Sequence, residues 1–345
     1  MAATTDLLTD KARLDAEYAA LSERCGLVDR CERGKLALSG PDAKTFLAGQ
    51  VTNDTEALRP GDGCYAAFLT HKGKMLGDLR ILDAGPTGPK NAGAGPDSDS
   101  DSGSSGEELL LDTERVALQA LFDMIRRFKI GYQLQLHKRT VQRGLLSLIG
   151  PDAIRVAAAD GLPDVEHANA PVEIGGIAAL AARTDAGVDL ICDAADTQAL
   201  TRALCERGAV AVSVQAAEIV RVEHGRPRYG VDMDESTIPQ EAGLNERAVS
   251  FTKGCYVGQE TVARLYYRGR PNRLLRGLRL SEPSPPGSEL RLGQRPVGRL
   301  SSAVLSPTFG PIGLGLVRRE AQLGACLSVG DGDVSATVVE LPFAT

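Results

Sequence analysis

Hydrophobic and polar residues follow a mixed pattern in the first part of the chain. Leu and Ala recur at helical spacing from Thr9 to Ser22. The stretch GKLALSGPDAKTFLAGQ then predicts a strand, a Gly-Pro turn and a helix that begins at Asp42. Helical spacing returns from Thr113 to Phe128. The chain therefore begins as mixed α and β structure.

Short apolar runs separated by Gly, Pro and Ser replace this pattern after Pro271. The runs are LLRGLRL, SELRLG, RPVGRLSSAVLS, IGLGLVRR, CLSVG and VSATVVEL. Regular short strands with turn residues between them are typical of a small antiparallel β-barrel. We therefore predict a mixed α/β region over residues 1–270 and a C-terminal barrel over residues 271–345.

The segment from Ala84 to Glu108 consists mainly of Gly, Pro, Ser and Asp and has almost nothing to bury. It separates LRILD from LLLDT, which are two predicted strands. We interpret the segment, about residues 84–108, as a disordered insertion at the tip of a hairpin. Its acidic serine run is also a candidate docking or phosphorylation site, although a solvated loop is the simpler interpretation.

Composition restricts the setting in which the protein works. A chain of 345 residues favours two or three packed domains, and a net charge of -6 argues against a chain-wide basic surface for nucleic acid or anionic lipid. No apolar run approaches the ~18 residues of a membrane span. The seven cysteines are scattered without metal-type spacing, so we expect reduced thiols, mostly in the core. We expect a cytoplasmic protein with no membrane partner and no direct nucleic-acid partner.

The stretch FTKGCYVGQE contains the strongest candidate for reactive chemistry. The residues after Gly258 predict a helix, which places Cys255 just ahead of the helix N-terminus and beside Lys253. The positive end of the helix dipole and a nearby ammonium both favour thiolate over thiol. The alternative is a buried cysteine in a tight turn. A Cys-His hydrolase pair has no supporting signature around the four histidines.

A second unusual side chain is a carboxylate at the end of a predicted helix. AAEIVRVEHGRPRYG reads as a helix through about His224, which puts Glu223 in the last turn. An acid there opposes the helix dipole by ~0.3 to 1 kcal/mol unless it has a partner. One interpretation is an ion pair with a nearby arginine, namely Arg221, Arg226 or Arg228. The other is a ligand with adjacent N–H donors, such as an aminopyrimidinone.

KGCYVGQE resembles the signature of the YgfZ family of folate-binding proteins. These are relatives of the T-protein, the aminomethyltransferase of the glycine cleavage system, and of a mitochondrial iron-sulfur assembly factor. LSGPDAKTFLAGQVTNDTEALRPGDGCYAAFLTHKGKMLGDLRIL and EIVRVEHGRPRYGVDMDESTIPQEAGLNERAVSFTKGCYVGQE resemble two further blocks of the superfamily. The resemblance covers most of the chain. It implies an α+β, aminomethyltransferase-like fold with two interleaved α/β subdomains around a cavity, closed by the C-terminal antiparallel barrel.

The resemblance also implies a tetrahydrofolate cofactor, or a one-carbon derivative of it, and a set of site residues. Cys255 and Lys253 are the candidate catalytic residues, and no metal site is implied. Glu223 matches the acid that holds the pterin in the T-protein. The remaining cofactor-binding candidates are Asn53, Asp54, Asp78, Tyr229, Gln259 and Arg264.

Two departures from the T-protein pattern bear on the activity. T-proteins carry an Asp-Asp pair where this chain has Gly77 and Asp78, and they lack a cysteine that matches Cys255. If the missing acid assists transfer to folate, this protein lacks that chemistry. The resemblance then implies iron-sulfur cluster assembly or repair, with iron-sulfur proteins or the assembly machinery as partners and an indirect effect on tRNA thio-modification enzymes. The alternatives are a tetrahydrofolate-dependent aminomethyltransferase and a docking protein whose thiol is structural.

Overall fold

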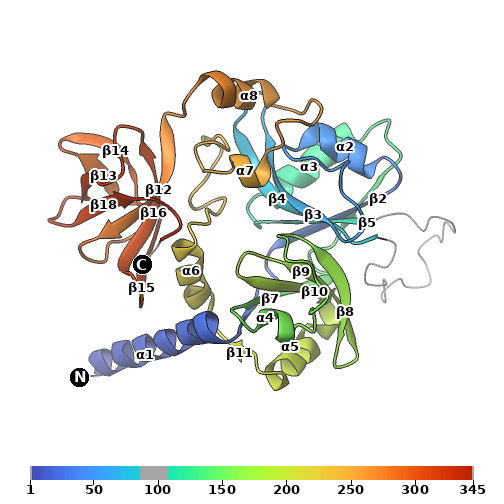
Figure 1. Cartoon of the computed structure of the whole chain (residues 1–345), viewed down its shortest axis with the longest axis horizontal. Helices are drawn as coiled ribbons and strands as arrows, with labels where there is room; N and C mark the ends of the chain where they lie inside the picture. Colours follow the sequence, from blue (N-terminus) through green and yellow to red (C-terminus); the bar gives the residue numbers. More distant parts are fainter. Residues whose placement is uncertain (1, 86–107, 344–345) are drawn as a thin grey trace.

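The computed structural model describes residues 2–85 and 108–343, so almost all of the predicted insertion lies outside the described residues. The main chain forms two sheets, a barrel and helices between them (Figure 1). The α-helices are α1 (Ala2–Glu23), α2 (Ala43–Gln50), α3 (Leu118–Phe128), α4 (Ala153–Val156), α5 (Thr197–Glu206), α6 (Val214–Glu223), α7 (Asn245–Ala248) and α8 (Gln259–Arg268).

The first sheet is antiparallel and has the strand order β3-β4-β5-β2-β6. Its strands are β2 (Gly34–Ser39), β3 (Gly63–Leu69), β4 (Met75–Asp83), β5 (Glu108–Thr113) and β6 (Gln135–Lys138). Ile81 of β4 lies opposite Leu111 of β5, which confirms the hairpin predicted on either side of the insertion. Helices α2 and α3 contribute Phe46 and Leu121 to the core of this sheet.

The second sheet has the order β11-β1-β7-β10-β9-β8. Its strands are β1 (Gly26–Asp29), β7 (Arg143–Ile149), β8 (Asn169–Ile174), β9 (Ile177–Arg183), β10 (Gly187–Asp193) and β11 (Val210–Ala211). The chain places β1 in this sheet, leaves to build the first sheet, and returns at β7. The two sheets are therefore interleaved along the sequence, and their packing brings together residues that are far apart in it.

The C-terminal sheet closes into an antiparallel barrel, because β12 pairs with both β18 and β16. Its strands are β12 (Arg273–Leu280), β13 (Glu289–Leu292), β14 (Arg295–Arg299), β15 (Ser302–Ser306), β16 (Gly310–Arg318), β17 (Cys326–Val329) and β18 (Ser335–Val339). Leu278, Leu290 and Val338 belong to its core. The predicted fold class, α+β with a C-terminal antiparallel barrel, is confirmed.

Helix α6 lies between the barrel and the two sheets, and α1 runs below the barrel beside α6 (Figure 1). The hydroxyl of Ser213 caps the first turn of α6 by accepting from the backbone N–H of Ala216. Glu17 of α1 accepts a hydrogen bond from the backbone N–H of Ser213 at 3.0 Å. Helix α1 is thereby fixed to the start of α6, which positions both helices beside the hollows described below.

Three expectations about local structure need correction or limits. The helix predicted from Thr113 begins only at Leu118, because Thr113 is the last residue of β5 and pairs with Gly34. The cysteines, all within the described residues, are free thiols, but just Cys25 and Cys192 are buried. The expectation that most of them lie in the core is therefore wrong. Across the described ranges, no helix has both the length and the apolar character needed to cross a membrane.

Candidate functional site

A cavity of about 250 Å³ lies where the two sheets meet α6. We call it the central cavity. Its charged lining, within the described part of the chain, comprises seven arginines and five carboxylates: Arg30, Arg33, Arg80, Arg221, Arg226, Arg228, Arg247, Asp112, Glu166, Asp185, Asp189 and Glu218. The lining therefore carries an excess of positive charge, which suits an anionic ligand.

Arg80 links the two sheets across the central cavity. It lies on β4, and its guanidinium is 2.7 Å from the carboxylate of Asp189 on β10 and 2.9 Å from that of Asp112 on β5. Arg33 donates to the same Asp112 at 2.6 Å. The Nε of Arg80 has no hydrogen-bond partner among the described residues, although the side chain of Arg80 is almost completely buried. The ion pairs hold the arginines in place while leaving one donor unused.

Asp78 is a buried acid that lies behind the wall of the central cavity. Tyr65 lines the cavity, and its hydroxyl donates to Asp78 Oδ2 at 2.5 Å. Burial raises the pKa of Asp78 to about 6, although the hydrogen bond from Tyr65 and the charge of Arg33 lower it. Burial and Asp78 also raise the pKa of Tyr65, so the phenol stays protonated and donates. Asp78 is not among the described residues that line the cavity, so proton exchange with a bound ligand would pass through the Tyr65 hydroxyl.

Position 77 faces away from this acid. A Cβ at Gly77 would lie 2.5 Å from the ring of Phe68 and 2.7 Å from the Cβ of Ala117, so a side chain there would enter the apolar core. Neighbouring residues of a strand point to opposite faces of a sheet, which places Asp78 on the face that carries Tyr65. The chain therefore retains an acid beside the central cavity although it lacks the first acid of the Asp-Asp pair.

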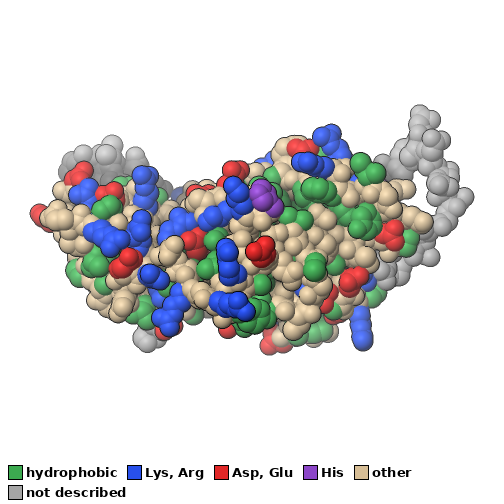
Figure 2. Space-filling model, turned by 90° about the horizontal axis from the view of Figure 1, so that it is seen from above, with side chains coloured by type: hydrophobic (Ala, Val, Ile, Leu, Met, Phe, Trp, Pro, Cys, Tyr) green, Lys and Arg blue, Asp and Glu red, His purple; other side chains and the backbone are tan. Residues whose placement is uncertain are grey.

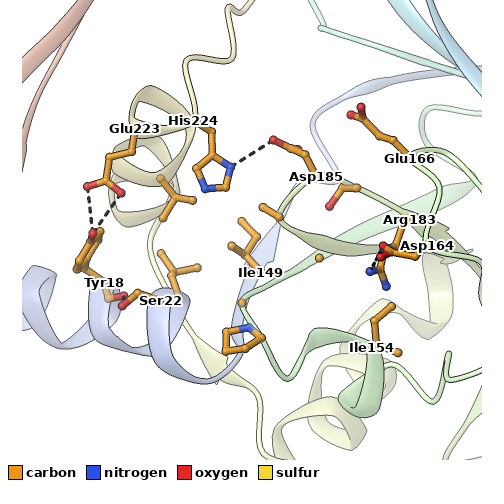
Figure 3. A pocket seen from close by; sticks show the side chains of 17 residues that line it. Tyr18, Ser22, Ile149, Ile154, Asp164, Glu166, Arg183, Asp185, Glu223 and His224 are labelled. Atoms are coloured by element: carbon orange, nitrogen blue, oxygen red, sulfur yellow. Dashed lines mark hydrogen bonds and ion pairs between the residues drawn. The ribbon is translucent and has the colours of Figure 1, made fainter. Parts of the chain in front are cut away.

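A wider cleft of about 600 Å³ adjoins the central cavity (Figure 3). We call it the α1 cleft, because Tyr18, Leu21 and Ser22 of α1 form one side of it. The two hollows share seven lining residues: Ile149, Glu166, Thr184, Asp185, Ala186, Val220 and His224. A long ligand could therefore extend from one hollow into the other.

Glu223 lines the α1 cleft and is the last residue of α6, as predicted. The interpretation that it pairs with a nearby arginine is wrong. Arg221 reaches Glu218 at 2.6 Å, Arg226 reaches Asp185 at 2.6 Å, and Arg228 reaches Glu218 at 3.3 Å. Glu223 instead accepts hydrogen bonds from the hydroxyls of Tyr18 and Ser306. It turns away from Asp185, as Figure 3 shows.

Asn53, Asp54 and Tyr229 make contacts with the protein itself. Asn53 Nδ2 donates to the carbonyl oxygen of Tyr65 at 2.8 Å, and Asp54 accepts from the backbone N–H of Glu56 at 3.1 Å. Tyr229 is buried in the core of the first sheet, and burial raises its pKa to about 12. None of the three is among the described residues that line the central cavity or the α1 cleft.

Cys255 is exposed on the loop before α8, so the buried alternative for this cysteine is wrong. The predicted helix is confirmed as α8. It begins after Gly258, whose backbone is in the left-handed region with a φ of 84°. Lys253, however, does not direct its ammonium to the thiol. Its Nζ donates to the carbonyl oxygens of three residues that end α2 and follow it, at 2.6, 2.9 and 2.7 Å: Ala48, Val51 and Asn53.

The remaining predicted residues, Gln259 and Arg264, lie on α8. Arg264 is exposed there, and neither residue is among the described residues that line the two hollows. Figure 2 shows Lys and Arg side chains over the middle of the upper face of the molecule, which is the face that carries α8 in Figure 1. This surface is therefore separate from the central cavity.

Sequence patterns gave no sign of the cavity residues Arg80, Arg247 and His167. Arg247 pairs with Glu166 and lies 5.0 Å from the centre of the Tyr65 ring. His167 has a φ of 74°, an unusual value for a residue other than glycine. Burial, followed by the charge of Arg80, lowers the pKa of His167 to about 4, so the imidazole is neutral at pH 7.

Comparisons with known proteins place this chain in a family. Residues 9–87 match the model of the GCVT N-terminal domain, and residues 273–344 match the glycine cleavage T-protein C-terminal barrel domain. An aminomethyltransferase of Synechococcus sp. (strain CC9311) is 30% identical, over 96% of this chain and 90% of the relative. The chain belongs to the aminomethyltransferase family.

Other similar proteins have comparable levels of identity. The aminomethyltransferase of Rubrobacter xylanophilus is 28% identical, over 96% of this chain and 86% of the relative. A chloroplastic protein of Arabidopsis thaliana, named as a transferase without a stated substrate, is 29% identical over 92% of this chain and 71% of the relative. The crystal structure of glycine cleavage system aminomethyltransferase T from Bartonella henselae has a TM-score of 0.79 at 22% identity. It covers 96% of this chain and 89% of that one, which supports the shared fold.

Proposed function

We propose that this chain binds tetrahydrofolate across the central cavity and the α1 cleft. The observation that carries the proposal is the joining of two hollows with different polar groups. The excess of arginines in the central cavity suits the carboxylates of the glutamate tail. Glu223 in the α1 cleft suits the adjacent N–H donors of the pterin ring. The residue types in these hollows therefore fit the ligand that the family resemblance implies.

The reaction class that this geometry supports best is one-carbon transfer of the aminomethyltransferase type. Bound tetrahydrofolate would supply the amine nitrogens that accept the one-carbon unit. Asp78 would accept the proton of the Tyr65 hydroxyl at Oδ2 as that hydroxyl takes a proton from the ligand, and would return it in the reverse step. The raised pKa of Asp78, about 6, suits proton exchange near neutral pH. The absence of an acid at position 77 removes nothing from the cavity, because that position faces the core.

A second candidate function is a YgfZ-type role in iron-sulfur cluster assembly or repair in the cytoplasm. The exposed thiol of Cys255, presented within the KGCYVGQE segment, favours it. Phe251 stacks on Tyr266 with ring centres 3.8 Å apart, which holds the loop against α8. The partners would be iron-sulfur proteins or their assembly machinery, and the effect on tRNA thio-modification enzymes would be indirect. In the described residues, no cluster of three or more His, Cys, Asp or Glu is arranged to hold a metal ion. A role for Cys255 with iron would therefore be transient.

Two assays separate these candidate functions. The first measures transfer of the one-carbon unit from an aminomethyl-lipoyl carrier to tetrahydrofolate by the wild type, Asp78→Asn and Cys255→Ser. The second measures rescue of cluster-dependent enzymes by the same variants in a cell that lacks the gene. Transfer that is lost in Asp78→Asn and kept in Cys255→Ser supports the transferase. Rescue that is lost in Cys255→Ser, with no transfer by the wild type, supports the iron-sulfur role and contradicts the transferase.

A further inference from the structure

A third hollow, of about 540 Å³, lies between the end of α6, the turn before α7 and the barrel. We call it the barrel hollow. It shares Asp185, His224, Arg226 and Arg247 with the central cavity. Asp185 and His224 also line the α1 cleft, and Figure 3 shows the contact between their side chains. The three hollows therefore meet at this pair, and a chain that leaves the central cavity past Arg226 and Arg247 enters the barrel hollow.

Backbone hydrogen bonds fix the two sides of the barrel hollow relative to each other. The N–H of Phe343, just after the last barrel strand, donates to the carbonyl oxygen of Glu223 at 2.9 Å. The N–H of Leu275, on β12, donates to the carbonyl oxygen of Glu241 at 2.7 Å. The barrel is thus tied both to the end of α6 and to the segment before α7. The hollow between these parts is therefore a fixed feature of the fold.

The barrel hollow contains three arginines, which differ in their partners. Arg226 pairs with Asp185 at 2.6 Å, and Arg247 pairs with Glu166. Arg276, on β12, is half-buried and has no ion pair or hydrogen bond among the described residues. A charge that is partly shielded from water attracts an opposite charge more strongly than a fully solvated one does. Arg276 is therefore the arginine of this hollow that is available to an anionic ligand.

Most of the remaining wall of the barrel hollow is apolar. The one acid that it adds to Asp185 is Glu340, which is exposed, so solvent and salt weaken its repulsion of an anion. Each unit of a γ-linked glutamate chain carries one free carboxylate and two methylene groups. Such a chain fits a wall that combines arginines with apolar side chains. The apolar side chains are Pro227, Ala242, Leu244, Leu275, Leu341 and Pro342.

We propose that the barrel hollow binds a γ-glutamyl extension of the bound folate, and that Arg276 pairs with one of its carboxylates. This inference rests on the proposed binding of tetrahydrofolate, whose single glutamate would occupy the central cavity. Further glutamates, joined through the γ-carboxyl group, continue past Arg226 and Arg247 toward β12. The preferred ligand is then a tetrahydrofolate that carries several glutamates.

The test is calorimetric titration of the full-length chain with tetrahydrofolate that carries one glutamate or three γ-linked glutamates. The wild type binds the triglutamate roughly fivefold more tightly, as expected for one partly exposed ion pair. Arg276→Gln removes the charge, keeps the affinity for the monoglutamate and loses most of this preference. Arg299→Gln is the matched control, because Arg299 is an exposed arginine of β14 that is not among the described residues lining the three hollows. Its preference stays at the wild-type value.

Glu340→Gln gives a second variant with the opposite sign, because it removes the acid from the barrel hollow and increases the preference for the triglutamate. Thermal unfolding of each variant shows whether the fold is retained. Binding of the monoglutamate without any preference for the triglutamate overturns this inference and leaves the proposed function intact. Equal losses of preference in Arg276→Gln and Arg299→Gln also overturn it, because they indicate a general charge effect. A wild type that binds neither compound overturns the proposed function together with this inference.

Discussion

Tyr65 and Asp78, on the paired strands β3 and β4, share a 2.5 Å hydrogen bond at the wall of the central cavity. Burial raises the pKa of this carboxyl group from the ordinary 3.8 to about 6. An acid with a raised pKa in the folded state stabilises the fold at low pH, and this contribution is lost as the pH rises through the folded pKa. The same pair therefore gives a stability signal and a candidate proton-exchange site.

The first prediction concerns Asp78→Asn. Between pH 5 and pH 8 the wild type loses about 1.4 kcal/mol of unfolding free energy through Asp78, because the folded group ionises near pH 6 while the unfolded group is already ionised. The variant has no such titration. Urea unfolding at the two pH values measures this change. From pH 5 to pH 8, the unfolding free energy of the Asn variant is expected to rise by that amount relative to the unfolding free energy of the wild type. An equal difference in unfolding free energy between the variant and the wild type at both pH values would show that Asp78 does not titrate in this range.

The second prediction concerns the missing acid of the Asp-Asp pair. Gly77→Asp is expected to destabilise the protein by about 3 kcal/mol or more, because the carboxylate would enter the core against Phe68 and Ala117. Gly77→Ala serves as the smaller control and is expected to cost less, because it adds volume without a charge. Chemical unfolding measures both. A stable Gly77→Asp variant with increased transfer activity would show that position 77 serves the cavity after all.

The third prediction separates the structural role of Lys253 from the reactivity of Cys255. Lys253→Met removes three donors from carbonyl oxygens around the end of α2 and is expected to lower the unfolding free energy by about 2 kcal/mol or more. The rate of Cys255 alkylation at neutral pH is expected to stay within about twofold of the wild-type rate, because the ammonium is directed elsewhere. Mass spectrometry of the alkylated peptide measures this rate. A tenfold slower reaction would restore Lys253 as an activator of the thiol.

The fourth prediction compares two arginines. Arg228 lines the central cavity, whereas Arg264 is exposed on α8. Arg228→Gln is expected to weaken tetrahydrofolate binding roughly fivefold at low salt and less at high salt, because screening reduces the wild-type advantage. Arg264→Gln is expected to leave binding unchanged. Equal losses in the two variants would indicate a general charge effect, and a loss confined to Arg264→Gln would move the anionic end of the ligand to α8.

The elements that the sequence predicted well are those with a local signal. Gly258 and the apolar spacing after it predicted α8, and the glycine-punctuated runs after Pro271 predicted the barrel. The sequence also predicted the end of α6 near Glu223, because a glycine and a proline follow soon after it. In each case the physical cause lies within a few neighbouring residues.

The central cavity could not be predicted in the same way. Arg80 forms an ion pair with Asp189 only because β4 and β10 lie in sheets that pack together. No local sequence pattern indicates that packing. The hydroxyl donors to Glu223 come from positions 18 and 306, at opposite ends of the chain. Lys253 lies two residues before Cys255 in sequence, yet its side chain extends to the end of α2. Proximity in sequence therefore gave a wrong prediction for Lys253, because the direction of its side chain determines which groups it contacts.

The central claim is that the joined hollows bind tetrahydrofolate, and calorimetric titration of the full-length wild type at pH 7 tests it most directly. A parallel titration uses a tetrahydropterin without the glutamate tail. The account predicts saturable one-to-one binding of tetrahydrofolate, tighter than that of the tailless compound, and a difference that shrinks as salt is raised. No saturable binding of tetrahydrofolate, or equal affinity for both compounds at low salt, would contradict it.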